Sequence, residues 1–171
     1  VPSRIVAQEC IAILTSPLLA RFLELLRHRD EAWCVELATR LHDACGERTP
    51  AVWEARLNIS GAPAAYLALM HDKPIALGDL LRDGTERSRP LDVVPLLIAR
   101  DREYFMLPGS DFKLVAGDRL LLAGRLSARR NLDFTLDNAN ELDYVLTGRE
   151  NSGTFFGRWL AARASGDQRP A

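Results

Sequence analysis

The sequence predicts an α+β fold, with an N-terminal helical hairpin followed by a small antiparallel or mixed β-sheet subdomain flanked by helices. Apolar residues recur at helical spacing through the first 45 residues. Residues 92–124 instead contain three short apolar runs separated by turns rich in Gly, Pro and Asp, which is typical of strands joined by tight turns. The chain has 171 residues, of which 47% are hydrophobic, so it is long enough to bury a core.

Composition and charge argue against several classes of protein. The formal net charge is −1, whereas nucleic-acid-binding domains are usually basic. No apolar run approaches the ~18–20 residues of a transmembrane helix, and no signal peptide is recognisable. The three cysteines Cys10, Cys34 and Cys45 are scattered, which favours structural thiols in a reducing compartment over a disulfide framework. Because the first residue is Val rather than Met, we interpret the chain as a fragment of a longer protein.

Residues 1–46 are predicted to form a helical dimerisation or crossover segment. Apolar spacing indicates a first helix over residues 3–14. Ser16 can cap a second helix over residues 17–27, and Pro17 suits its first position. This second helix is apolar over more than half of its circumference, so it must be buried by its own chain or by a partner. We favour a dimer interface over a plain core hairpin. The residues expected at that interface are Pro17, Leu18, Phe22 and Leu25.

A third helix is predicted over residues 30–45. Asp30 can cap its start, and Gly46 can end it. Its apolar stripe consists of Trp33, Leu37 and Leu41, at positions i, i+4 and i+8. The short linker that follows, over residues 46–50, is the best candidate for a domain boundary.

Residues 50–125 are predicted to form the β-sheet subdomain. Alternating apolar residues indicate a half-buried strand over residues 51–59. Two helical segments over residues 62–70 and 74–82 and a polar loop over residues 83–90 follow it. The three strands of residues 92–124 complete the subdomain.

Residues 126–161 are interpreted as a C-terminal extension. Its first five residues, 126–130, look like a basic connector, and residues 131–148 mix strand spacing with helical spacing. Three aromatic residues, Phe155, Phe156 and Trp159, are expected to dock a terminal segment onto the protein or onto a partner. Residues 162–171 are expected to form a disordered tail.

The order of elements in residues 50–125 resembles the C-terminal subdomain of RCK proteins, the regulators of potassium conductance (TrkA-C type). The pieces that carry the resemblance are Ile98-Ala99-Arg100, Met106-Leu107-Pro108 and the segment from Leu114 through Gly117-Asp118 to Gly124. The short segment ALGDLLR, residues 76–82, matches the family's helix before the loop. Residues 3–14, the turn at Ser16-Pro17 and residues 17–27 resemble the helix–turn–helix through which RCK subunits pair. The family's Rossmann-like lobe is missing, because no G-x-G-x-x-G motif is present.

The resemblance implies a regulatory rather than an enzymatic role. It predicts a cytosolic domain of a potassium channel or potassium transporter, on the cytoplasmic side of the membrane, in which ligand binding rearranges paired subunits. The implied partners are a second copy in a homodimer or higher ring, the pore domain of the parent membrane protein and a small anionic ligand, but no nucleic acid. The ligand itself, and any cofactor, stays open.

Arg100 is the residue that we expect to bind a ligand. Some family members bind cyclic di-AMP with an arginine at this position and a nearby asparagine, and no asparagine is present in the neighbouring strand here. Two copies of Arg100 near a two-fold axis could pair with a carboxylate or bind an anion. The alternative is an arginine that faces solvent at the end of a strand.

No catalytic residue and no metal site is predicted. Cys34, His42 and Cys45 share part of one helix, but their spacing matches no standard zinc pattern. Two alternatives to the regulatory role are a dimerisation scaffold without a ligand and a small enzyme with a pocket around Asp118 and His42.

Overall fold

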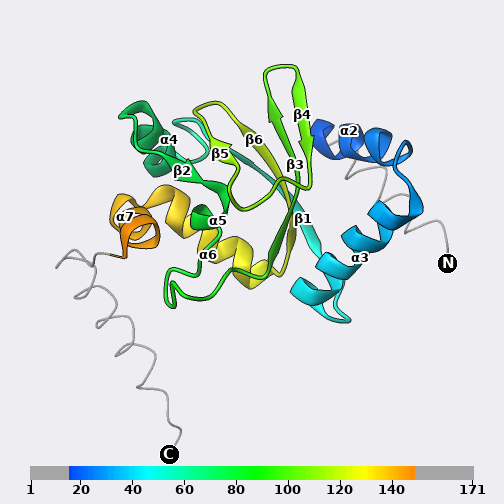
Figure 1. Ribbon diagram of the computed structural model, residues 1–171. Helices are drawn as coiled ribbons and strands as arrows, with labels where there is room; N and C mark the ends of the chain where they lie inside the picture. The colour runs from blue at the N-terminus through cyan, green and yellow to red at the C-terminus, as the bar shows by residue number, and fades with distance from the viewer. Residues whose placement is uncertain (1–15, 149–171) are drawn as a thin grey trace, which may run out of the picture.

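The computed structural model of the protein describes residues 16–148. Within this range it contains six helices and two antiparallel sheets, which confirms the α+β fold (Figure 1). The helices are α2 (Pro17–Leu26), α3 (Glu31–Cys45), α4 (Pro63–Met70), α5 (Leu77–Leu80), α6 (Leu126–Asp137) and α7 (Ala139–Thr147). The strands are β1 (Ala51–Arg56), β2 (Ile75–Ala76), β3 (Val93–Arg100), β4 (Glu103–Met106), β5 (Lys113–Leu114) and β6 (Arg119–Gly124).

The main sheet has four strands in the order β1-β6-β3-β4, and every neighbouring pair is antiparallel. The three strands predicted in residues 92–124 are confirmed as β3, β4 and β6. Sequence spacing missed the short pair formed by β2 and β5, because β2 occupies the start of the segment predicted to be helical. The β3–β6 register shifts between Pro95 and Leu97, where proline has no N–H to donate to the ladder.

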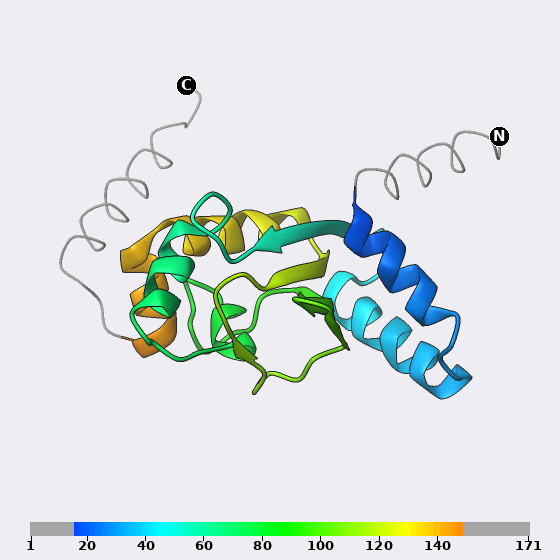
Figure 2. The ribbon, with the colours of Figure 1, turned by 90° about the horizontal axis from the view of Figure 1, so that it is seen from above.

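Helices cover both faces of the main sheet (Figures 1 and 2). Alternate residues of β6 face opposite sides, as the two-residue repeat of a strand requires. Leu120 and Leu122 join the core beneath α4 to α7, whereas Leu121 and Ala123 join the core beneath α2 and α3. The unbroken apolar run of this strand therefore reflects a sheet that is buried on both sides.

Helices α2 and α3 form the helical hairpin of the described chain, and each begins where its capping residue predicts. Ser16 accepts a hydrogen bond from the N–H of Leu19 at 3.1 Å, and Asp30 accepts one from the N–H of Trp33 at 2.9 Å. Gly46 adopts a φ of 62° just after α3, which ends the helix. The predicted helix over residues 3–14 lies outside the described residues.

The prediction of a basic connector over residues 126–130 was wrong, because these residues form the first part of α6. The ambiguous residues 131–148 are helical and divide at Asn138, whose side chain caps α7. The inward side of α6 consists of Ala128, Leu132 and Leu136, at positions i, i+4 and i+8. Phe134, on the outer side of this helix, is 56% exposed. This part of the predicted extension is integral to the core.

No helix within residues 16–148 is both long enough and apolar enough to cross a membrane. The predicted tail, the aromatic cluster before it and Cys10 all lie outside the described residues.

Candidate functional site

Arg100, the predicted ligand residue, forms a two-pronged ion pair with Asp118. Its Nε donates to Oδ1 at 2.8 Å, and its Nη2 donates to Oδ2 at 2.9 Å. The carboxylate is fully buried, and it also accepts a hydrogen bond from the N–H of Val115 at 2.9 Å. The hydrogen bond from Arg100 to Asp118 is the main reason that the pKa of this guanidinium is raised. Of the alternatives left open for Arg100, pairing with a carboxylate is the one seen here, and the carboxylate comes from the same chain.

Two aromatic rings complete the surroundings of this ion pair. The guanidinium carbon of Arg100 lies 5.8 Å from the centre of the Phe105 ring and 5.1 Å from that of Phe112. The rings meet edge to face, with centroids 5.0 Å apart. Nη2 of Arg100 also donates to the carbonyl oxygen of Lys113 at 2.8 Å. The side chain of Arg100 is 28% exposed, so a ligand could contact only that exposed part of it.

The ion pair exists because the two strands that carry it are neighbours. Arg100 ends β3, and Asp118 directly precedes β6, which runs antiparallel beside it. Gly117 makes the turn into β6 with a φ of +93°, a conformation that favours glycine. Asp118 also accepts a hydrogen bond from the N–H of Leu57 through its main-chain oxygen, which ties this turn to the end of β1.

A cleft of about 690 Å³ opens between the helical hairpin and the β-sheet subdomain. Its walls come from α3, from α5 and from the loop after β4, and its floor includes the start of β3. Residues that line it are Arg40, Asp79, Arg82, Leu91, Ser110 and Asp111. Its volume falls within the ~300–1,000 Å³ of small-molecule sites. Its mixture of arginine, carboxylate, hydroxyl and apolar groups suits a small polar molecule.

Backbone hydrogen bonds hold two walls of this cleft together. The N–H of Leu77 donates to the oxygen of Phe112 at 2.9 Å, and the N–H of Gly78 donates to that of Ser110 at 2.8 Å. A Cβ on Gly78 would lie 2.7 Å from the Cβ of Ser110, so glycine permits this close approach. Sequence reasoning did not identify the cleft, although two of its walls belong to segments that carry the RCK resemblance.

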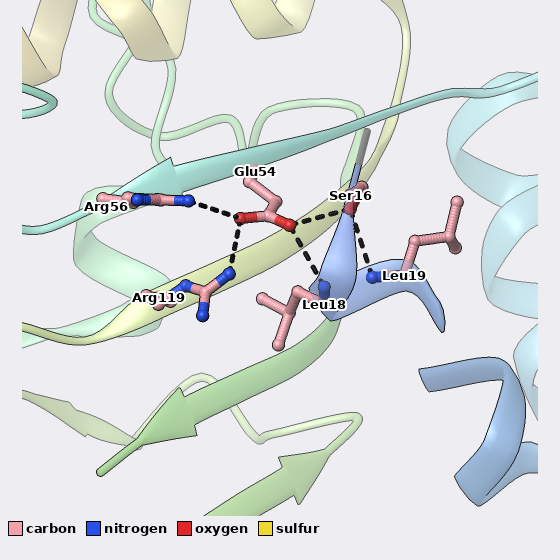
Figure 3. A network of polar contacts seen from close by, with 6 residues as sticks. All are labelled: Ser16, Leu18, Leu19, Glu54, Arg56 and Arg119. Carbon is pink, nitrogen blue, oxygen red and sulfur yellow. Dashed lines mark hydrogen bonds and ion pairs between the residues drawn. The ribbon is translucent and has the colours of Figure 1, made fainter. Parts of the chain in front are cut away.

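Glu54, on β1, anchors the start of the helical hairpin (Figure 3). Its Oε1 accepts hydrogen bonds from the hydroxyl of Ser16 at 2.7 Å and from the N–H of Leu18 at 3.2 Å. Its Oε2 accepts one from Arg119 at 3.0 Å, and Arg56 lies 3.7 Å away. Burial raises the pKa of Glu54, but the hydrogen bonds, first of all from Ser16 and Arg119, outweigh burial and lower the net pKa. The charged carboxylate is therefore the form that holds α2 on the sheet.

The predicted dimer-interface residues occupy two different environments. Leu18 and Phe22 are 2% and 4% exposed and pack against the chain's own sheet. The burial of these two side chains therefore does not require a partner. Pro17 is exposed, and Leu25 is partly exposed. For those two residues the interface stays a prediction.

The residues considered for an enzyme or a metal site are not brought together. Asp118 lies just before the first residue of β6. His42 lies near the C-terminal end of α3, and the chain continues from there to Ala51, which pairs with Gly124, the last residue of β6. The six residues of β6 separate these ends by roughly 17 Å at about 3.3 Å per residue. Cys34 is exposed and Cys45 is buried, and residues 16–148 contain no group of three potential ligands among His, Cys, Asp and Glu.

Comparison with known proteins does not assign the chain to a family. No family model matches the chain, and no curated protein matches it in sequence. A functional interpretation therefore depends on the motifs, the ion pair and the cleft.

Proposed function

We propose that this chain is a cytosolic regulatory domain of a potassium channel or potassium transporter and that it acts through the pairing of two copies. The observation that carries the proposal is the ion pair between Arg100 and Asp118. These two residues belong to separate pieces of the RCK-like pattern, the Ile-x-Arg strand end and the Gly-Asp turn. The ion pair explains physically why the strand end and the Gly-Asp turn occur together in one sequence, because each supplies one of its two charges.

The arrangement of residues 51–124 supports the same proposal. Helices α4 and α5 follow β1, then the hairpin of β3 and β4, and then the Gly-Asp turn into β6. This order agrees with the expectation from the resemblance, with the short β2–β5 pair added.

The cleft supports regulation by a small ligand. Arg40 belongs to the helical hairpin, whereas Asp79, Ser110 and Asp111 belong to the subdomain, so one molecule bound there would contact both. A ligand shifts a conformational equilibrium only through different affinities for the two states. A molecule that contacts both the hairpin and the subdomain has different affinities for two states if the distance between these parts differs in the two states. The expected response is a change in the position of the hairpin, which a membrane pore could sense.

Ligand binding can be tested by thermal shift with adenine nucleotides, cyclic di-AMP and divalent cations. A ligand present at a hundred times its Kd should stabilise the folded state by ~2.7 kcal/mol. For a chain of 171 residues this corresponds to a Tm increase of roughly 5–10 °C. Arg40→Ala should abolish most of that increase, whereas Arg102→Ala, in the exposed turn after β3, should retain it.

Pairing can be tested by gel filtration with light scattering. Leu23 is 36% exposed on α2, beside the buried side of that helix, so Leu23→Glu should shift a dimer toward monomer without disturbing the core. The matched control is Val35→Glu on α3, where the valine is 59% exposed. A chain that is monomeric at micromolar concentration and stabilised by none of the probes would overturn the proposal. A stable dimer that none of the probes stabilises would favour the scaffold without a ligand.

A further inference from the structure

An apolar groove of about 290 Å³ lies between α4 and α7. These two helices are on the sheet face opposite the helical hairpin (Figures 1 and 2). Leu67 and Ala68 of α4 form one wall, and Leu142 and Leu146 of α7 form the other. The ion pair of Lys73 with Asp143, at 3.0 Å, lies at its rim. The volume is at the lower limit of small-molecule sites, so the groove is better suited to one or two large side chains.

The apolar surface extends beyond the groove along α4. Leu67 is 49% exposed, and Met70, one turn later on the same helix, is 57% exposed. Eight consecutive residues, from Pro63 to Met70, carry no charge, so this helix lacks the polar outer face that a helix in contact with water usually has. Such a surface indicates a segment that covers it.

The chain itself leaves the described structure beside this groove. Arg87 donates hydrogen bonds to the carbonyl oxygens of Val145 at 2.7 Å and Leu146 at 3.0 Å, which fixes the last turn of α7. Gly148 then adopts a left-handed conformation with a φ of 74°. Arg87 therefore fixes the end of α7 beside the groove, and the chain continues from there.

The sequence after Gly148 contains a suitable occupant. Phe155, Phe156, Trp159 and Leu160 stand at positions i, i+1, i+4 and i+5, which is the spacing of one apolar helix face. Phe155 follows Leu146 by nine residues, which can reach up to about 30 Å at ~3.3–3.6 Å per residue. The nine residues of α7 are only about 14 Å long at ~1.5 Å each. The linker is long enough to turn and place the aromatic residues along the groove.

We infer that residues 154–160 of this chain dock into the groove between α4 and α7 of the same molecule. A short tether raises the effective concentration of the segment to the order of 1 mM, so a segment with a Kd of ~100 μM as a free peptide would be about 90% docked. Docking would bury the aromatic side chains together with Leu67. The inference is independent of the proposed regulatory role, because it depends only on this groove and on the chain that follows it.

Limited chymotrypsin digestion of the full chain tests the inference, since this protease cleaves after aromatic residues. Leu67→Glu should speed cleavage at Phe155, Phe156 and Trp159 by up to about tenfold, because a segment that is ~90% docked is exposed only ~10% of the time. Leu126→Glu, at a leucine that is 61% exposed on α6, is the matched control and should leave the rate unchanged. Equal cleavage of the parent and Leu67→Glu, or equal acceleration by both variants, would overturn the inference.

Disulfide trapping tests whether residues 154–160 occupy the groove, and unlike Leu67→Glu it introduces no charge there. In a background with Cys10, Cys34 and Cys45 replaced by alanine, Leu67→Cys and Phe155→Cys should form a bond within one chain under mild oxidation. A pair that joins Val35→Cys on α3 to Phe155→Cys should not. Crosslinks between two chains, equal crosslinking of both pairs or no crosslink at all would each contradict docking within the molecule.

Discussion

Removal of the carboxylate of Asp118 is expected to destabilise the protein more than most surface changes. Asp118→Ala eliminates two charge-assisted hydrogen bonds from Arg100 and leaves the N–H of Val115 without its acceptor. Loss of one partner from a buried ion pair costs about 3–5 kcal/mol. Because Arg100 is 28% exposed and can regain some hydration, we expect a smaller loss of about 2–3 kcal/mol. For 171 residues this predicts a Tm decrease of roughly 4–12 °C.

The measurement is urea unfolding at pH 7 for Asp118→Ala, Arg100→Ala and the double variant, with Arg102→Ala as the control for loss of an exposed arginine. The two single changes should be strongly coupled, and the double variant should lose less stability than their sum by about 1–3 kcal/mol. Losses that add to within about 0.5 kcal/mol would refute a direct interaction. An Arg100→Ala loss no larger than that of Arg102→Ala would likewise show that the pair contributes little.

Two further predictions concern the attachment of the hairpin and the close contact between β3 and β6 at Gly124. Glu54→Gln should lower the free energy of unfolding at pH 7 by about 1–2 kcal/mol, because hydrogen bonds to the charged carboxylate are lost. Folding lowers the pKa of Glu54, so its stabilisation is present above the usual carboxylate pKa and is lost as the pH falls through the lowered value. The difference between parent and Glu54→Gln should shrink over that range in unfolding curves, and a constant difference would contradict the assignment. Gly124→Ala should cost about 1–3 kcal/mol in the same assay, because its Cβ would lie 3.0 Å from the Cα of Val93 and closer still to the oxygen of Asp92. A Gly124→Ala variant as stable as the parent would show that β3 and β6 can separate freely at this end.

The proposed regulatory role places two demands on the helical hairpin. The hairpin must remain attached to the sheet, and it must still respond to a ligand. Attachment comes from Glu54 at the start of α2 and from the burial of Leu18 and Phe22. Response is expected at α3, where Trp33, Leu37 and Leu41 are only partly buried and Arg40 faces the cleft. The more loosely packed helix is therefore the one that would contact the ligand.

Local signals in the sequence were sufficient for several elements. Ser16 and Asp30 predicted helix starts correctly because a capping bond involves a backbone N–H only three residues away. Pro108-Gly109 and Gly117-Asp118 marked the turns that separate the strands, because turn conformation depends on a few adjacent residues. The fold class followed from these signals and from the periodicity of the apolar residues between them.

Only the tertiary structure decided which distant residues meet. Arg100 and Asp118 are 18 positions apart, and their contact depends on the antiparallel pairing of β3 with β6. The sequence likewise could not tell whether Leu18 and Phe22 pack on a partner or on the chain's own sheet, because both arrangements bury the same apolar surface. Periodicity alone determined that α2 needs an apolar neighbour, whereas the path of the whole chain determined that the neighbour is β3 and β6.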